Sequence, residues 1–149
     1  MSNEFKWEYR FIDLAKFISC WSKDPSTKVG AVIVDSRNRI VSVGYNGFPV
    51  GIEDSQILLN SREMKYKKIV HAEANSILFA NKSLDNCSLY CFPMFPCSNC
   101  CALIIQSGIR KIIAPLSTNP RWIESINLSI EMCEEAGVEY KLIDCRFRI

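Results

Sequence analysis

The amino-acid sequence predicts an α/β fold in which helices cover both faces of a mixed five-stranded sheet. Three observations support this: two β-branched runs that form an opening hairpin, helical spacing of apolar residues in several later segments, and an alternation of helix and strand after the hairpin. The 149 residues, 48% apolar and 23% charged, are typical of a globular protein. We therefore expect a single domain spanning residues 1–149.

The chain is expected to begin with a helix followed by a hairpin. Apolar residues keep helical spacing over residues 4–22, and Asp24-Pro25 is expected to end this helix. Residues 29–35 and 39–45 are rich in β-branched side chains and flank the polar turn 36–38. This pattern predicts two antiparallel strands.

A loop rich in glycine and proline is expected over residues 46–60, with weak helical character over 61–67. After it, we expect helices over residues 71–81, 97–107 and 121–136, and strands over 88–92, 111–114 and 138–143. Gly108 and Gly137 are expected to end the last two helices, because glycine readily takes the left-handed conformation that follows a helix. The alternation predicts a sheet with helices on both faces.

A candidate metal site combines His71, the only histidine, with Cys97 and Cys100 in the segment Pro96-Cys97-Ser98-Asn99-Cys100. One imidazole and two thiolates are good ligands for Zn²⁺ and leave the fourth tetrahedral position open for water. Both motifs fall at expected helix starts, where the helix dipole favours the thiolate form. We expect these three side chains to hold a catalytic zinc ion.

Glu73 lies two residues after His71 and is the candidate proton carrier. Zinc with an open position makes hydroxide available at neutral pH for attack on a carbon that bears an amine. If that carbon belongs to an aromatic ring, Glu73 would take the water proton and pass it to the ring nitrogen next to the attacked carbon. It would later protonate the departing ammonia. Two alternatives remain: a closed zinc knuckle with Cys101 or Cys91 as fourth ligand, and a histidine buried in the core.

The other cysteines suggest packing rather than disulfides. No export signal is evident, and clustered cysteines in a reducing compartment more often bind metal. Cys101 adjoins a ligand but points elsewhere on its helix, so we expect it to pack in the core. Five more cysteines in apolar surroundings are expected to be buried, inert thiols: Cys20, Cys87, Cys91, Cys133 and Cys145.

Charge and hydropathy narrow the class of partner. A formal net charge of +2 is too small to indicate nucleic-acid binding by itself. No apolar run approaches the roughly 18 residues that a membrane span requires. The charged N-terminus does not resemble a signal peptide. We expect a cytoplasmic protein that binds neither nucleic acid nor membrane.

Several segments together resemble deoxycytidylate deaminases of the cytidine deaminase superfamily. The two metal motifs form the H-x-E…P-C-x-x-C signature of zinc-dependent nucleobase deaminases. Further matching segments are Ser22-Lys23-Asp24-Pro25-Ser26-Thr27-Lys28-Val29-Gly30, Gly44-Tyr45-Asn46-Gly47-Phe48-Pro49, the continuation Ala74-Asn75-Ser76-Ile77, and Leu103-Ile104-Ile105-Gln106-Ser107-Gly108-Ile109. The metal motifs indicate the superfamily, and the Ser-Lys-Asp-Pro and Gly-Tyr-Asn-Gly segments indicate the nucleotide branch.

The resemblance implies hydrolytic deamination of dCMP to dUMP in a three-layer α/β/α cytidine deaminase-like fold. It also implies a homo-oligomer, commonly a hexamer, that is activated by dCTP and inhibited by dTTP, with Mg²⁺ accompanying the effector. A second, structural zinc in some relatives is built partly from additional histidines, which this chain lacks, so that only an all-cysteine version of that site is left open.

The resemblance also assigns roles to residues outside the metal motifs. Asn46 would contact the sugar and Ala72 would lie against the substrate. Ser22, Lys23 and Thr27 would bind the phosphate, and Gly47, Phe48, Gly51 and Asp54 would bind the effector nucleotide. The residue types also allow simpler interpretations, in which Asn46 is a turn residue and Ser22-Lys23-Asp24-Pro25 is a solvated helix end.

Arg121 and Trp122 follow Asn119-Pro120 and are candidates for closing over the nucleotide, by phosphate contact and stacking respectively. Trp122 is equally suited to be the first core residue of the last helix. Competing functions are deamination of tRNA, of free cytidine, or of a pterin or riboflavin precursor, and a binding module without turnover. The intact Glu73 argues against the binding module.

Overall fold

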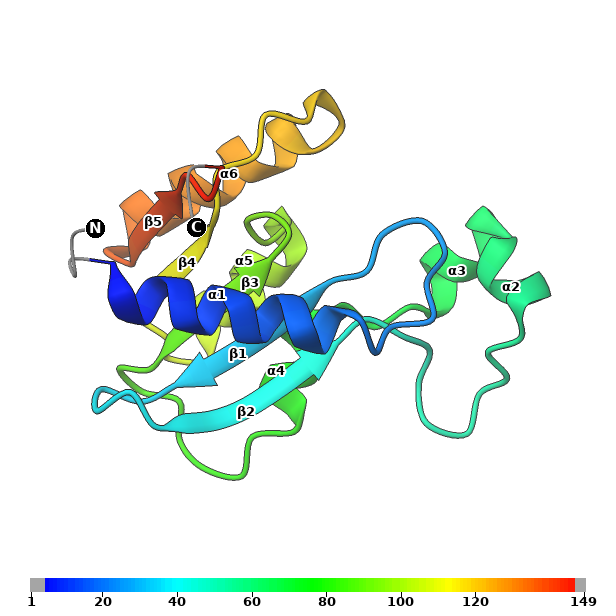
Figure 1. Cartoon of the computed structure of the whole chain (residues 1–149), viewed down its shortest axis with the longest axis horizontal. Coiled ribbons are helices and arrows are strands. Elements are labelled where there is room, and N and C mark those ends of the chain that lie inside the picture. The colour runs from blue at the N-terminus through cyan, green and yellow to red at the C-terminus, as the bar shows by residue number, and fades with distance from the viewer. Residues whose placement is uncertain (1–4, 147–149) are drawn as a thin grey trace.

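The computed structural model describes residues 5–146 and contains a mixed five-stranded sheet with strand order β2-β1-β3-β4-β5 (Figure 1). β1 pairs antiparallel with β2 and β3, and β4 and β5 continue parallel to β3. The strands are β1 (Gly30–Val34), β2 (Ile40–Tyr45), β3 (Ser88–Phe92), β4 (Lys111–Pro115) and β5 (Glu139–Ile143). The predicted mixed sheet is confirmed.

Helices connect and cover these strands. Within residues 5–146 they are α1 (Lys6–Ser19), α2 (Gln56–Asn60), α3 (Arg62–Lys68), α4 (Ala72–Leu78), α5 (Ser98–Gln106) and α6 (Pro120–Ala136). In this part of the chain, no helix has the length and apolar character needed to cross a membrane. Gly108 and Gly137 have φ values of +96° and +75°, so both take the left-handed conformation expected after α5 and α6.

The sheet separates the apolar core into two layers. Along β1, Val32 and Val34 face a cluster that includes α1, whereas Ala31 and Ile33 face a larger cluster that includes α4, α5 and α6. This alternation follows from the two-residue period of a strand. Figure 1 shows α1 crossing in front of the sheet, with α4 and α5 behind it. The arrangement is the predicted α/β/α sandwich.

Two glycines let helices lie directly against strands. A Cβ atom added to Gly30 would lie 2.0 Å from the carbonyl oxygen of Ala15 in α1. A Cβ atom added to Gly44 would lie 2.5 Å from both the Ala72 carbonyl oxygen and the Ser76 amide nitrogen of α4. Only glycine fits at such distances, so Gly44 determines how closely the start of α4 approaches β2.

The first helix is shorter than the sequence predicts. It runs from Lys6 to Ser19, and the expected start at residue 4 lies outside the described residues. The expected end at residue 22 is wrong because the chain turns earlier. The Ser22 hydroxyl donates to the Asn46 carbonyl at 2.8 Å, which directs this segment away from the helix axis.

The predicted loop over 46–60 contains a short helix. Ser55 caps α2 by accepting a hydrogen bond from the Leu58 amide at 3.4 Å, and Leu59 is buried. Ser61 then caps α3, which confirms the weak helical signal over 61–67. Helix α4 is shorter than the predicted 71–81 and ends at Leu78.

Two of the five cysteines expected to be buried are not. Cys20 is exposed and Cys145 is half-buried, whereas Cys87, Cys91 and Cys133 are buried as predicted. The apolar neighbours that suggested burial of Cys20 are themselves on the surface, with Phe17 61% and Trp21 53% exposed.

Candidate active site

His71, Cys97 and Cys100 meet where α4 and α5 begin. His71 is the residue before α4, Cys97 is the residue before α5, and Cys100 lies in the first turn of α5. The His71 Nδ1 atom lies 3.6 Å from the Cys97 sulfur and 3.3 Å from the Cys100 sulfur. All three ligand atoms fall within 4.8 Å of one another. Two helix starts therefore bring an imidazole and two thiols together.

The protonation states of this cluster favour a cation. A hydrogen bond from the Cys100 thiol, followed by the contact with His71, lowers the pKa of Cys97. The hydrogen bond with Cys97, followed by burial, raises the pKa of Cys100. The hydrogen bond with Cys97 also raises the pKa of His71. A metal ion bound between the three groups would favour the deprotonated form of both sulfurs.

The donor set fits zinc with an open coordination position. One nitrogen and two sulfurs are ligands that Zn²⁺ prefers, and three protein ligands are typical of catalytic rather than structural sites. Among residues 5–146, the cluster has no fourth member of a metal-binding type (histidine, cysteine, aspartate or glutamate), and no second cluster of this kind occurs. Cys101, one alternative fourth ligand, is buried with its sulfur 3.6 Å from that of Cys133.

Glu73 lies in the first turn of α4 with only 4% of its surface exposed. Burial raises the pKa of its carboxyl, and the nearby Cys97 adds to the increase. Cys91 is also fully buried, and burial holds the pKa of this thiol well above its usual range. Glu73 is not one of the three clustered residues. It is a buried carboxyl close to them, and its raised pKa favours the protonated form.

A cavity of about 420 Å³ opens above this carboxyl. This volume suits a small organic ligand, and the walls combine apolar side chains with a few polar groups, as in many ligand sites. The lining residues are Asp24, Ser26, Thr27, Val29, Asn46, Arg62, Lys65, Tyr66, Ile69, His71, Ala72, Glu73, Met94, Phe95, Cys97, Arg121 and Trp122.

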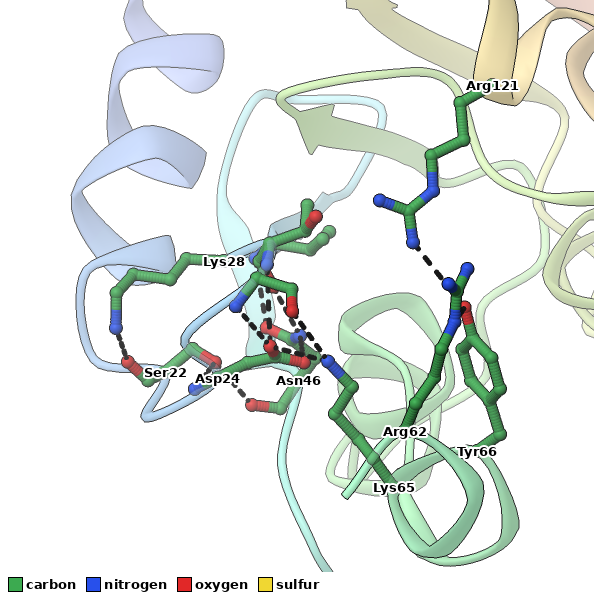
Figure 2. Close-up of polar contacts among 11 residues, drawn as sticks. Ser22, Asp24, Lys28, Asn46, Arg62, Lys65, Tyr66 and Arg121 are labelled. Atoms are coloured by element: carbon green, nitrogen blue, oxygen red, sulfur yellow. Dashed lines mark hydrogen bonds and ion pairs between the residues drawn. The ribbon is translucent and has the colours of Figure 1, made fainter. Parts of the chain in front are cut away.

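One wall of the cavity is a buried polar network around Asn46. The Asn46 Oδ1 atom accepts from the Val29 amide at 2.9 Å, and Nδ2 donates to the Thr27 carbonyl at 2.9 Å and to Asp24 at 3.4 Å. Asp24 forms a buried ion pair with Lys65 at 3.1 Å (Figure 2). Asn46 is thus rigidly held, and one lone pair of Oδ1 remains for a ligand.

The residues predicted to bind phosphate occupy different positions. Thr27 lines the cavity, but Ser22 and Lys23 are not among the lining residues. Ser22 is buried and bonds the Asn46 carbonyl, and Lys23 points outward to form an ion pair with Asp54 at 3.0 Å. Nothing in these contacts supports a phosphate role for Ser22 or Lys23, which stays a prediction.

Arg121 and Trp122 both line the cavity, as does Ala72. Figure 2 shows Arg121 reaching from the start of α6 toward the ends of Arg62 and Tyr66, which project from α3. The Tyr66 hydroxyl receives hydrogen bonds from Arg62 Nε at 3.1 Å and from Arg121 Nη2 at 3.4 Å. Trp122 is half-buried and packs against the core as well as lining the cavity. Its position therefore fits both sequence-based interpretations, a residue that closes over the ligand and the first core residue of α6.

The residues expected to bind an effector lie outside the cavity. Gly47 forms an isolated antiparallel bridge with Val70, Gly51 has a φ of +86°, and Asp54 is paired with Lys23. Phe48 is half-buried in the same loop. Any ligand held by these four residues would occupy a second site.

Sequence reasoning did not identify the contribution of α3. Arg62, Lys65 and Tyr66 lie three and four residues apart, and this spacing places them on one face of a helix. That face lines the cavity. The spacing was readable in the sequence, but it also fits an ordinary solvated helix, and only the tertiary structure shows which side the face meets.

Comparisons with known proteins agree with this geometry. The family model described as the cytidine and deoxycytidylate deaminase zinc-binding region matches residues 5–115. An uncharacterized deaminase in the luxG 3′ region of Aliivibrio fischeri is 50% identical over 137 residues, covering 90% of this chain and 91% of that protein. Deoxycytidylate deaminase of Homo sapiens is 40% identical over 114 residues, covering 72% of this chain and 64% of the human protein.

Solved structures also match. The crystal structure of dCMP deaminase from the cyanophage S-TIM5 in apo form has a TM-score of 0.72 and 26% identity, covering 96% of this chain and 100% of that one. The same phage enzyme in complex with dCMP and dUMP has a TM-score of 0.71 and 25% identity, covering 95% and 99%.

The sandwich fold, the three-member cluster and the buried carboxyl define a hydrolytic deaminase with a metal site. The match over residues 5–115 and the relatives make the assignment more specific. This chain belongs to the cytidine and deoxycytidylate deaminase family and carries its zinc-binding region.

Proposed function

We propose that this protein catalyses hydrolysis of dCMP to dUMP and ammonia, as one catalytic domain. The observation that carries the proposal is a buried carboxyl, Glu73, that lines a cavity of about 420 Å³ together with His71 and Cys97 of the His-Cys-Cys cluster. The choice of dCMP is supported by relatives named deoxycytidylate deaminase and by the phage enzyme bound to dCMP and dUMP.

His71, Cys97 and Cys100 would hold the zinc ion. Bound there with an open position, zinc supplies a hydroxide nucleophile at neutral pH. The lowered pKa of Cys97, caused first by its hydrogen bond with Cys100, favours the thiolate that a metal requires.

Glu73 moves the protons. Its carboxylate takes one proton from the attacking water and delivers it to ring nitrogen N3 of cytosine. The same carboxylate then takes the proton of the hydroxyl group newly bonded to C4 and delivers it to the amino group. The C4–N bond breaks, ammonia leaves and the C4 carbonyl of uracil forms. Burial raises the pKa of Glu73, which helps this carboxyl to hold a proton between the two transfers.

The rest of the cavity would orient the nucleotide. The free lone pair of Asn46 Oδ1 suits a sugar hydroxyl, and the apolar Ala72 suits the base. Trp122, half-buried on the cavity wall, offers an aromatic face for stacking.

Regulation and assembly are further parts of the proposal. We expect dCTP with Mg²⁺ to activate and dTTP to inhibit through the loop that carries Gly47, Phe48, Gly51 and Asp54, in a homo-hexamer. The separation of this loop from the cavity is compatible with a second nucleotide site. A cytoplasmic location suits a chain whose eight cysteines include a metal-binding thiol pair.

Ammonia release is the direct test. Zinc-loaded protein is incubated with dCMP, deoxycytidine or tRNA, with and without dCTP–Mg²⁺, and ammonia and the deaminated product (uracil from cytosine, hypoxanthine from adenine) are quantified. We expect turnover of dCMP above the other two substrates. A zinc-loaded protein that releases no ammonia from dCMP in either condition would contradict the proposed activity.

Glu73→Gln tests the proton carrier. The amide occupies the same volume but cannot exchange protons, so turnover should fall by about 10²–10⁴-fold. Zinc content, measured by elemental analysis, should remain at the wild-type level. Near-normal turnover in this variant would refute the role of Glu73.

A further inference from the structure

Helix α6 holds the peptide groups on both sides of Cys97. The Ser98 amide donates to the Ser125 hydroxyl oxygen at 3.0 Å. The Ser129 hydroxyl donates to the Pro96 carbonyl at 2.8 Å. Ser125 and Ser129 are four residues apart in α6, so both side chains lie on one face of this helix. The chain is therefore fixed immediately before and immediately after one sulfur-bearing residue of the His-Cys-Cys cluster.

Helix α5 does not supply these contacts by itself. Cys97 is the residue before α5, and its side chain makes no capping hydrogen bond to the helix. The first amides of a helix have no acceptor within the helix, so they need one from elsewhere. The Ser125 hydroxyl provides an acceptor for the Ser98 amide from 27 residues further along the chain. A side chain of another helix thus caps α5, and the Cys97 sulfur stays available for a metal ion.

The burial of Ser129 indicates that its hydroxyl is needed where it lies. Ser129 has 0% of its surface exposed and lies between the buried Ile126 and Cys133 on the core face of α6. A buried hydroxyl costs free energy unless it is hydrogen-bonded, and an alanine would fill nearly the same space without that cost. Pro96 is buried as well, and buried carbonyls are nearly always hydrogen-bonded. The bond from Ser129 meets both requirements.

A second contact of Ser129 reaches the other end of the motif. Its backbone carbonyl accepts a hydrogen bond from the Cys101 thiol at 3.5 Å, and Cys101 directly follows Cys100 of the cluster. The Cys101 sulfur also lies 3.6 Å from that of Cys133, one helical turn after Ser129. One face of α6 therefore follows the whole segment that carries both sulfurs of the cluster.

We propose that Ser125 and Ser129 are positioning residues of the zinc site, which hold Cys97 in the orientation in which its sulfur binds the metal. Neither hydroxyl belongs to the three-member cluster. Groups that orient a ligand without touching the metal typically contribute about 10–100-fold to metal affinity. Both serines lie beyond residues 5–115, which the family model matches. The inference rests on the proposed function, in which the cluster holds zinc.

Zinc affinity tests the role directly. The dissociation constant of zinc is measured by competition with a colorimetric chelator for wild type, Ser125→Ala, Ser129→Ala and the double variant. Ser129→Ala should weaken zinc binding by about 100-fold, because water has no access to replace a fully buried hydroxyl. Ser125→Ala should weaken it by about 10-fold, because Ser125 is half-buried and water can partly replace its oxygen. Ser125→Thr keeps a hydroxyl, so its affinity should stay within about threefold of wild type.

Ser19→Ala is the matched control. Ser19 is also a buried serine whose hydroxyl donates to a carbonyl, that of Lys16 at 2.6 Å, but it lies in α1 on the other face of the sheet from α6. Loss of this bond should lower the urea midpoint of unfolding, as in Ser129→Ala, while the zinc dissociation constant stays within about twofold of wild type. Circular dichroism of the zinc-free proteins establishes that each variant is folded before the titration. If zinc-free Ser129→Ala does not fold, the comparison of Ser125→Ala with Ser125→Thr decides.

The outcomes separate the positioning role from the proposed activity. Unchanged zinc affinity in the alanine variants of Ser125 and Ser129, with a lowered urea midpoint, would show that these serines only stabilise packing and would refute the role. An equal loss of zinc affinity in Ser19→Ala would refute it as well. If zinc binding weakens as expected but zinc-loaded wild type releases no ammonia from dCMP, the positioning role stands and the activity fails. If dCMP is turned over and the variants bind zinc as wild type does, the activity stands and the positioning role fails.

Discussion

Gly44→Ala places one methyl group where α4 crosses β2, directly behind the candidate site. The new Cβ atom would lie 2.5 Å from the Ala72 carbonyl oxygen and the Ser76 amide nitrogen, about 0.9 Å short of the 3.4 Å at which ordinary contact begins. Both neighbours are backbone atoms and cannot rotate away. The start of α4 must therefore move, together with His71 and Glu73.

Two costs are expected from this movement. Overpacking of a well-packed core costs about 1–3 kcal/mol of stability. A displacement near 1 Å of a group involved in catalysis costs about 100-fold in rate. Urea unfolding gives the first quantity and dCMP turnover at equal zinc content gives the second.

Gly47→Ala provides a steric control for the stability measurement. An added Cβ at Gly47 meets nothing within 4 Å, so the free energy of unfolding should change by less than about 0.5 kcal/mol. If Gly44→Ala is as stable as Gly47→Ala and keeps full turnover, the close approach of α4 to β2 does not position the site.

Three other predictions address the metal, the buried ion pair and the core. Removal of zinc by a chelator should lower the Tm. If free zinc is about a thousandfold above its Kd, bound zinc stabilises the fold by about 4 kcal/mol, which corresponds to roughly 8–16 °C in Tm for a chain of this length. An unchanged Tm would argue against a bound metal. Lys65→Met should lower the free energy of unfolding by about 3–5 kcal/mol, because the buried Asp24 loses its ion-pair partner. The double variant Lys65→Met/Asp24→Asn should be more stable than Lys65→Met alone, and a double-mutant cycle measured by urea unfolding tests this. Burial raises the pKa of Tyr90 to about 12, against about 10 when unfolded. The stability that this phenol contributes is therefore complete below pH of about 10 and is lost as pH rises toward 12, so the alkaline decline in unfolding free energy should be less steep in Tyr90→Phe.

The strands and the helix ends were predictable because each depends on local chemistry. The strand Ser88–Phe92 lies in the centre of the sheet, and its short apolar run predicts a strand from these five residues alone. Gly108 and Gly137 end their helices because left-handed backbone favours glycine, wherever the helix packs. The grouping of His71, Cys97 and Cys100 was predictable for a similar reason, since residue type and spacing already limit the chemistry that these side chains can perform.

The cavity wall could not be predicted because it depends on the path of the chain. Lys65 pairs with Asp24, 41 residues earlier, and Arg121 meets Tyr66, 55 residues earlier. Helix α2 was missed because its stability comes from one serine cap and one buried leucine rather than from an apolar repeat. Cys20 was wrongly predicted to be buried, because apolar neighbours in the sequence do not reveal which face of α1 meets the sheet.

The bridge between Gly47 and Val70 has a consequence for how such a protein diversifies. Their reciprocal hydrogen bonds, at 3.1 Å and 2.8 Å, close the neck of an excursion that contains α2 and α3 and leaves the sheet at one end (Figure 1). His71 follows this neck directly, whereas Arg62 and Tyr66 lie inside the excursion. The five strands, His71 and Glu73 all lie outside this segment, whereas Lys65 inside it holds the buried Asp24. We therefore expect that changes within the segment which keep Lys65 can alter the cavity wall, and with it the choice of substrate, without moving the residues of the proposed chemical step.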